Sequence, residues 1–439
     1  NDSDITNQVN ILNSFDGTTP IVSGGGEYER LVTAGSTTVD VDYTPVISDL
    51  TPEADGGDTI VYEDDLLATR SSGESEGSDN TKESTTQQGT FTIASGDGID
   101  SLTVGGNAVI TGGVFAATSF TTALGNTLEV TGFDGITVTY TYRLNDNELS
   151  TLGFNDGQDS IYEDFDVVLK DTDTDEATGT LSIQIVDDSP TSTVDTTVAV
   201  PVFTLDETRP ENSDTAGGTA PSGLMSFTAD FANNFNYVYG ADGAGSVEHT
   251  LVLNGANVQS GLFAIDLSDT STSDTVGPVD GYGQGDEILM NQVGDVITGA
   301  INGVTYFTIS INDLNAEITF AQVGTPVNAI WHPNTGSSDE PVVMTLAVDT
   351  IKVVQTVTDA DDDVATSSID LSSNVFAIQD DGPAVITALD LDVPNEVGSW
   401  SANINGLDFG ADSVSNFEIT TYPTIEGVTH SWDAATHTL

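Results

Sequence analysis

Ile136-Thr-Val-Thr-Tyr-Thr-Tyr-Arg-Leu144 alternates apolar and polar side chains without a break. Successive side chains of a strand point to opposite faces, so this pattern predicts a strand with one buried face. Shorter runs of the same kind are found at 181–185, 307–311 and 344–348. Thr, Val and Ile dominate these runs, whereas Gly, Asn and Asp separate them, and no apolar stripe of helical period extends beyond about three turns. The chain is therefore predicted to be all-β and mainly antiparallel.

Two acidic octapeptides divide the chain into repeats. They are Asp171-Thr-Asp-Thr-Asp-Glu-Ala-Thr178 and Asp359-Ala-Asp-Asp-Asp-Val-Ala-Thr366. A short strand pattern follows each, and then a closing motif, Asp187-Asp-Ser-Pro190 or Asp380-Asp-Gly-Pro383. Such internal repetition predicts tandem antiparallel β-sandwich domains of the immunoglobulin-like or cadherin-like kind.

Each predicted repeat also opens with an acidic pair, Glu63-Asp64 in the first and Asp206-Glu207 in the second. A Gly-Asp turn recurs within the repeats at 96–98, 240–243 and 410–413. The predicted organisation is an N-terminal β segment or end of a preceding repeat at 1–58, a first sandwich at 59–190, a second at 191–385, and a partial third at 386–439.

The strongly negative charge of the chain limits which partners are expected. The chain has 70 Asp and Glu against 7 Lys and Arg, for a formal charge of -63. Nucleic acids and anionic membranes attract Lys and Arg clusters, which this chain lacks, so neither is an expected partner. Divalent cations are expected partners, because they relieve the mutual repulsion of the carboxylates. The alternative is that the charge serves solubility alone.

Carboxylates at every second position of the octapeptides predict a hard cation, and calcium is the first choice. The loops are not EF-hands, because the sixth position is Glu176 or Val364 and the twelfth is Ser182 or Asp370. Other loops must therefore complete the coordination. The candidate calcium ligands are Asp171, Asp173, Asp175, Asp359, Asp361 and Asp363 in the octapeptides, with Glu63, Asp64, Asp187, Asp188, Asp206, Glu207, Asp380 and Asp381 in the edge pairs.

The edge pairs suggest how an ion would act. Asp187 and Asp188 close one predicted sandwich a short linker before Asp206 and Glu207 open the next. An ion that collects six to eight oxygens from two domains and their linker would restrict the hinge. The alternative for any single carboxylate is a solvated turn or a cap on a short helix.

Catalysis is not expected. The chain has no cysteine, and its four histidines, His249, His332, His430 and His437, fall in no zinc-binding spacing. The single Gly-x-Ser-x-Gly match, at 73–77, lies in a polar segment from Arg70 to Gln88 that is predicted to be a solvated loop. The sequence contains no run of about 18 apolar residues, so no membrane-spanning helix is predicted.

At these motifs the sequence resembles a known family. Thr356-Val-Thr-Asp-Ala-Asp-Asp-Asp-Val-Ala-Thr366 is similar to the T-x-T-D-A-D-G-D-x-A-T strand ending of large type I secreted bacterial adhesins, the repeats-in-toxin (RTX) adhesins, with Asp362 where that family usually has Gly. The segments 178–190 and 377–383 resemble its domain-closing signature, and 305–333, ending in Ala329-Ile-Trp-His-Pro333, resembles the middle of a repeat. The resemblance covers roughly 60–385 and part of 389–439, and the Gly-rich nonapeptides are absent.

The resemblance implies a secreted, extracellular protein on the bacterial cell surface. Its expected function is that of a calcium-stiffened spacer that projects an adhesive domain and supports attachment or biofilm formation. Its expected partners are calcium ions, neighbouring domains of the same long chain, and a host or surface ligand held by other domains. One alternative is a sugar- or peptide-binding module that uses Trp331, Trp400 or Trp432, and another is a filament or surface-layer subunit assembled by strand addition.

Overall fold

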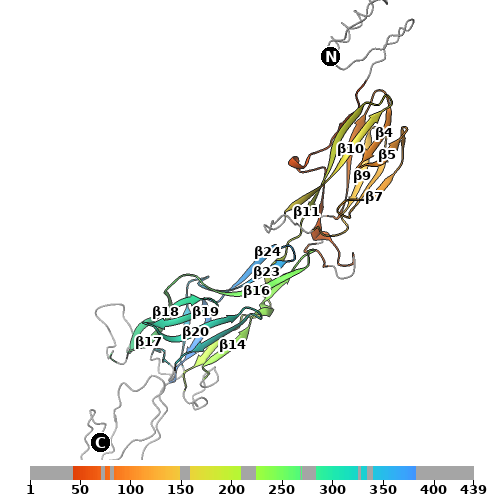
Figure 1. Ribbon diagram of the computed structural model, residues 1–439. Coiled ribbons are helices and arrows are strands. Elements are labelled where there is room, and N and C mark those ends of the chain that lie inside the picture. Colours follow the sequence, from red (N-terminus) through yellow and green to blue (C-terminus); the bar gives the residue numbers. More distant parts are fainter. Residues whose placement is uncertain are drawn as a thin grey trace, which may run out of the picture. The chain divides into compact units, whose positions relative to one another are not determined.

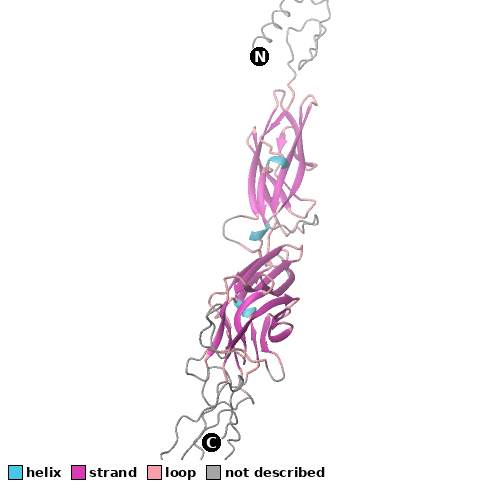
Figure 2. Cartoon of the chain, turned by 90° about the vertical axis from the view of Figure 1, so that its left-hand side faces the viewer, coloured by secondary structure: helices cyan, strands magenta, loops and turns pink. Residues whose placement is uncertain are grey.

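The computed structural model describes residues 43–70, 75–79, 84–148, 159–208, 224–266, 268, 283–324, 328–333 and 340–381. The predicted partial third repeat at 386–439 and residues 1–42 of the predicted N-terminal segment lie outside these residues. In the described part, the helices are three single turns of 3-10 helix: η1 (Glu53–Asp55), η2 (Glu63–Asp65) and η3 (Ala232–Asn234) (Figure 2). The protein is all-β, as predicted.

The chain forms two compact units. The first contains the described residues between Asn1 and Pro190 together with Tyr239–Gly245 and Thr358–Val364. The second contains the described residues within Thr191–Val238, Ser246–Val357 and Ala365–Leu439. The first long segment ends at Pro190, the last residue of the first closing motif. The sequence predicted contiguous repeats, and the structure differs because two short acidic segments from the second repeat fold with the first unit.

Two sheets build the first unit (Figure 1). One has the strand order β1-β3-β9-β8-β7 and the other β2-β11-β10-β4-β5-β6. The strands of the first sheet are β1 (Val46–Ser48), β3 (Thr86–Ala94), β7 (Thr118–Thr121), β8 (Thr127–Phe133) and β9 (Thr137–Arg143). Those of the second are β2 (Thr59–Tyr62), β4 (Ile99–Val104), β5 (Asn107–Thr111), β6 (Val114–Phe115), β10 (Ser160–Asp171) and β11 (Glu176–Val186).

Strand β9 shows why the two sheets pack. Its alternation buries Val138, Tyr140 and Tyr142, while Ile136, just before the strand, remains exposed. Two buried tyrosines reach the opposite sheet: the Tyr140 hydroxyl lies 2.6 Å from Thr59 Oγ1 of β2, and the Tyr142 hydroxyl donates to Glu163 of β10 at 2.7 Å. Buried tyrosines usually satisfy their hydroxyl in this way, so the core also fixes how the sheets align.

Two boundaries of the first repeat differ from the prediction. Strand β1 pairs with β3, with Val46 opposite Ala94, so the sandwich begins before residue 59. The segment from Arg70 to Gln88 is not entirely a solvated loop, because Thr86 to Gln88 belong to β3 and Ser78 contacts Asp188. Both differences arise from pairing with distant residues.

Strands from four sheets build the second unit. Their orders are β14-β21-β20-β19-β18-β17, β13-β25-β22, β16-β23-β24 and β12-β15. The strands are β12 (Thr191–Val194), β13 (Phe203–Asp206), β14 (Ser226–Asp230), β15 (Phe235–Val238), β16 (Ala244–Leu253), β17 (Val258–Ile265), β18 (Gln284–Val293), β19 (Val296–Ile301), β20 (Val304–Asn312), β21 (Glu317–Gln322), β22 (Pro341–Thr345), β23 (Ile351–Asp359), β24 (Val364–Asp370) and β25 (Ser373–Gln379).

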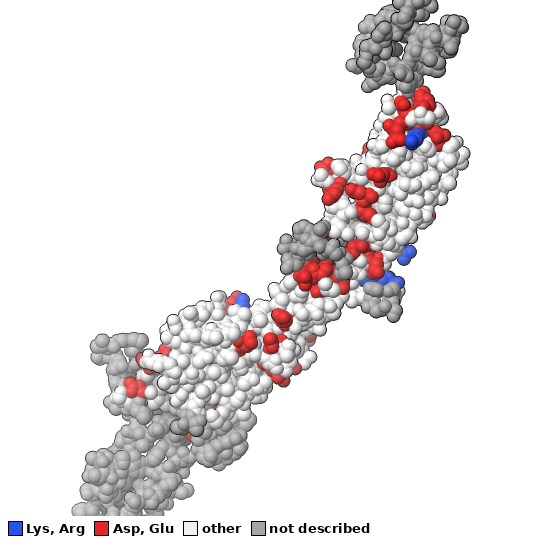
Figure 3. Space-filling model, viewed as in Figure 1, with Lys and Arg blue, Asp and Glu red and all other residues white. Residues whose placement is uncertain are grey.

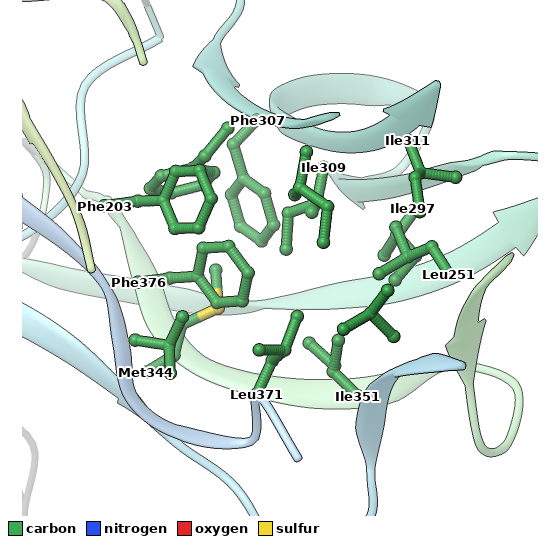
Figure 4. Close-up of a cluster of buried hydrophobic side chains, with 14 of the residues drawn as sticks. Phe203, Leu251, Ile297, Phe307, Ile309, Ile311, Met344, Ile351, Leu371 and Phe376 are labelled. Carbon is green, nitrogen blue, oxygen red and sulfur yellow. The ribbon is translucent and has the colours of Figure 1, made fainter. Parts of the chain in front are cut away.

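Aromatic and aliphatic side chains fill the core of the second unit (Figure 4). Phe376 of β25 stacks on Phe203 of β13 with ring centroids 5.1 Å apart, and its ring meets the edge of Phe320 from β21 at 5.2 Å. The contact with Phe320 joins the sheet β13-β25-β22 to the six-stranded sheet. The predicted strand from Met344 to Val348 ends at Thr345 instead, because a turn at Asp349 with φ 63° leaves Val348 exposed.

A parallel strand pair recurs in both units and positions the acidic pairs. In the first unit β2 runs parallel to β11, with Tyr62 opposite Val186. In the second unit β13 runs parallel to β25, with Asp206 opposite Gln379. Parallel partners end at the same edge of a sheet. The opening and closing acidic pairs of each repeat therefore come together at one end of its sandwich.

Candidate metal centre

The two octapeptides form the same closed turn. The main-chain nitrogen of Asp359 donates to the carbonyl of Asp363 at 3.1 Å, and that of Asp171 donates to the carbonyl of Asp175 at 3.2 Å. In return, Asp363 N donates to Asp359 Oδ1 at 2.8 Å, and Asp175 N donates to Asp171 Oδ1 at 2.9 Å. The first aspartate of each motif thus uses one carboxylate oxygen to accept the hydrogen bond that closes its turn.

Each turn contains one residue with left-handed backbone. Asp362 has φ 83° and Thr174 has φ 86°. Glycine adopts this region at no steric cost, and aspartate visits it as a single residue. Threonine is unfavourable there because it is β-branched.

Carboxylates converge in the first unit at two overlapping groups. Glu63, Asp187 and Asp242 each offer an oxygen within 4.8 Å of the others, and so do Asp242, Asp359 and Asp361. Glu63 begins η2, Asp187 follows β11, and Asp242 lies in the segment Tyr239–Gly245. Side chains from four separate chain segments therefore meet in this cluster, which we call the acidic cluster.

The acidic cluster is buried and poor in hydrogen bonds. Glu63 is 1% exposed, Asp359 2%, Asp187 6% and Asp242 9%. Glu63 Oε1 accepts from the nitrogen of Glu148 at 2.8 Å, and Asp242 Oδ1 accepts from Asn147 Nδ2 at 3.0 Å. Buried oxygens without a hydrogen bond are Glu63 Oε2, Asp187 Oδ1 and Oδ2, Asp242 Oδ2, Asp359 Oδ2, and Asp361 Oδ1 and Oδ2.

Burial and mutual repulsion raise the pKa values of carboxylates in the acidic cluster. Burial, followed by the charge of Asp361, raises the pKa of Asp242 to about 7. The pKa values of Glu63, Asp187 and Asp359 are also raised, first by burial and then by neighbouring carboxylates. Buried carboxylates without partners are strongly destabilising unless a proton or a cation neutralises them.

A hard divalent cation fits this donor set. All the unpaired atoms are carboxylate oxygens, and calcium takes six to eight oxygen ligands at about 2.3 to 2.6 Å. No nitrogen or sulfur donor belongs to either group. Of the predicted ligands, Glu63, Asp187, Asp359 and Asp361 lie in the acidic cluster, with Asp363 buried beside them in the same turn.

Asp188 has another role. It is fully buried, and it accepts hydrogen bonds from the nitrogens of Ser78 at 2.8 Å, Ala241 at 2.7 Å and Ser189 at 2.9 Å, as well as from the Ser78 hydroxyl. Both oxygens are used, so Asp188 anchors two loops of the first unit instead of joining the cluster. The edge residue Asp64 is buried nearby, and its carbonyl accepts from Asp79 N at 3.2 Å.

The turn of the first octapeptide forms a smaller group. Asp171 and Asp173 lie with Asp97 in a set of oxygens within 4.8 Å. Asp171 is buried, and burial followed by Asp173 raises its pKa. Asp97 is half-buried, Asp173 is exposed, and Asp175 does not belong to the group.

A third group lies in the second unit and contains a histidine. Glu207, Asp380 and His332 offer ligand atoms within 4.8 Å of one another. Burial raises the pKa of Asp380 to about 6, with His332 acting in the opposite direction. Of the other predicted ligands, Asp206 caps the backbone at Thr208 N at 2.8 Å, and Asp381 is buried beside Asp380.

Three members of these groups were not among the predicted ligands: Asp97, Asp242 and His332. The recurring Gly-Asp turn is a signal that could have identified the first two, because it occupies the same place in each repeat. No spacing rule could identify His332, since its neighbours Glu207 and Asp380 are distant in sequence. Of the tryptophans, Trp331 is half-buried against the edge of Phe263, while Trp400 and Trp432 lie outside the described residues.

Acidic side chains dominate the charged surface of the face shown in Figure 3. Within the described residues, no helix has the length and apolar character needed to cross a membrane. Fold and site together define an all-β protein with two sandwich units and buried carboxylate clusters.

Comparisons with known proteins add little to that class. A family model for a domain of unknown function (DUF5801) matches residues 202–372, and no curated protein sequence matches the chain. Among solved structures, extracellular cadherin domains 1–4 of protocadherin gamma B7 align with 75% of this chain and 76% of that chain, at 9% identity and a TM-score of 0.18. Domains 1–5 of protocadherin gamma B2 align with 78% and 74%, at 10% identity and a TM-score of 0.14. The fold class rests on the strand pairings described above.

Proposed function

We propose that this chain is a calcium-stiffened spacer of a bacterial cell-surface adhesin. The acidic cluster carries the proposal, because seven buried carboxylate oxygens without hydrogen bonds converge from four chain segments. Calcium bound there would neutralise the mutual repulsion of the carboxylates and cross-link the four chain segments. Two of the segments, Tyr239–Gly245 and Thr358–Val364, come from the predicted second repeat, so the same ion would also cross-link them to Glu63 and Asp187 of the first repeat.

The wider setting is part of the same proposal. The resemblance of the octapeptides and closing motifs to secreted adhesin repeats supports an extracellular position on a bacterial surface, with neighbouring repeats of the same chain as partners. Calcium is plentiful outside cells, so such sites would remain filled there. The role is mechanical, to hold an adhesive domain away from the cell.

The test combines thermal unfolding with small-angle X-ray scattering of the full chain, first in chelator and then in millimolar calcium. Binding to the folded state alone stabilises it by about 2.7 kcal/mol per site when free calcium is about a hundredfold above Kd. We expect a rise in melting temperature and a longer, stiffer particle with calcium, and a much smaller response to magnesium. Glu129→Gln removes one exposed carboxylate of β8 and serves as the charge control. Equal responses to calcium and magnesium, or none, would overturn the proposal.

A further inference from the structure

The group formed by Glu207, His332 and Asp380 in the second unit differs chemically from the acidic cluster. It offers one imidazole nitrogen and two carboxylates. His332 is 7% exposed and Glu207 is 1% exposed. Imidazole is a ligand of zinc and other first-row transition metals, whereas calcium is bound by oxygen. The donor set therefore favours a different ion from the one expected at the acidic cluster.

Neighbouring groups orient both side chains toward a common point. Glu207 Oε1 accepts from the nitrogen of Ile330 at 3.0 Å and from Gln322 Nε2 at 2.5 Å. These bonds leave Glu207 Oε2 buried without a hydrogen bond. His332 Nδ1 lies 2.9 Å from the carbonyl oxygen of Glu340, to which it donates, so Nε2 carries the lone pair in the neutral ring. Outer hydrogen bonds of this kind fix the tautomer and direction of metal-binding histidines.

The distance between the two inward atoms fits a shared ion. His332 Nε2 lies 3.6 Å from Glu207 Oε2, which is longer than a normal hydrogen bond of about 2.7 to 3.2 Å. Two ligands of a tetrahedral zinc ion, each at about 2.0 to 2.1 Å from it, lie about 3.4 Å apart. Asp380 directly follows β25, which pairs in parallel with β13, and it offers a third ligand atom within 4.8 Å of the other two.

We propose that Glu207, His332 and Asp380 form a binding site for a divalent transition-metal ion of the zinc class, separate from the calcium sites. The inference does not depend on the proposed spacer function. It assigns His332, which belongs to no zinc-binding sequence motif, as the residue that determines selectivity. The competing explanation is that a protonated His332 forms an ion pair with the two carboxylates and that no metal binds.

The test uses the full chain, stripped of metal and held in millimolar calcium so that oxygen-only sites are filled. Cobalt(II) chloride is the probe, because its visible absorption reports on nitrogen and oxygen ligands, and zinc chloride is the competitor. We expect a saturable absorption that zinc displaces. His332→Gln should lower the cobalt affinity of this site at least tenfold. His249→Gln is the matched control, since His249 is also buried and belongs to none of the metal groups.

A second variant distinguishes loss of metal binding from loss of the fold. Glu207→Gln keeps an oxygen to accept from Ile330 N and replaces only the inward atom, so it should fold and still lose cobalt affinity. Thermal unfolding without cobalt checks the fold of both variants. If wild type shows no saturable cobalt signal, if both variants keep it unchanged, or if calcium displaces cobalt as well as zinc does, the ion-pair explanation holds and the metal site is rejected.

Discussion

Asp363 N lies 2.8 Å from Asp359 Oδ1, and this bond leaves the other oxygen, Oδ2, buried without a hydrogen bond. One atom of the side chain thus closes a turn while the other faces the acidic cluster. A solvated turn would leave that second oxygen in water. The local bond therefore links the octapeptide motif to the buried site.

Asp361→Asn should raise the melting temperature without calcium and lower it with calcium. Both Asp361 oxygens are buried without hydrogen bonds beside Asp242 and Asp359. In chelator the substitution removes one repelling charge, so the melting temperature should rise. In millimolar calcium it removes a ligand, so most of the increment of about 2.7 kcal/mol expected for a filled site should disappear. Differential scanning calorimetry in both buffers measures this, and a change of the same sign in both would contradict the assignment.

Asp188→Ala should destabilise the protein equally with and without calcium. The substitution leaves Ser78 N and Ala241 N without their acceptor. Losing hydrogen bonds to a buried charged group should cost about 3 kcal/mol. Urea unfolding at both calcium levels provides the measurement. Asp188→Asn retains one acceptor oxygen and should cost less, whereas a calcium-dependent loss would show that Asp188 is a ligand after all.

Thr174→Gly should stabilise the first unit. Thr174 has φ 86°, where a β-branched residue is strained. Relief of the left-handed conformation gains about 1 to 2 kcal/mol, and glycine's greater freedom in the unfolded chain offsets part of it. A net gain of about 1 kcal/mol is expected from chemical denaturation in chelator, and a smaller one for Asp362→Gly. Thr178→Gly, which lies in β11 opposite Val168 of β10, is the control and should destabilise.

His249 should make the second unit sensitive to mild acid. Burial lowers its pKa below the ordinary 6.5, and Gln355 Nε2 lies 3.2 Å from its Nε2, where the neutral ring accepts. The unfolded chain therefore binds the proton more readily than the folded one. The contribution to stability is fully present above pH of about 6.5 and is lost as the pH falls toward the folded value.

His249→Gln, which keeps an acceptor for Gln355, removes this titration. Between about pH 7.5 and about pH 5.5 the melting temperature of wild type should therefore fall more than that of the variant. The difference between the two proteins isolates His249 from the acidic groups, which titrate in both. Parallel curves would show that His249 does not contribute.

Some elements could be predicted from the sequence because their cause is local. The alternation from Val138 to Leu144 sets which face of β9 is buried, and the run from Phe307 to Ile311 does the same for β20. The run from Met344 to Val348 failed, because a turn at Asp349 ends the strand whatever the hydrophobic pattern. Strand β1 was predicted only as part of an N-terminal β segment at 1–58, because it is three residues long and its place in the first sandwich is defined by its partner β3.

The sequence by itself determined the all-β class, the repeat and the acidic turn, because period, composition and i to i+4 hydrogen bonds act over a few residues. Only the tertiary structure decided which of the candidate carboxylates converge with buried oxygens that lack hydrogen bonds. The parallel pairings of β2 with β11 and of β13 with β25 bring distant acidic pairs to one edge, as no spacing rule could indicate. Packing then buried Asp188 among donors, Asp187 among carboxylates and Glu207 beside His332, and burial with its particular neighbours gives similar acids different roles.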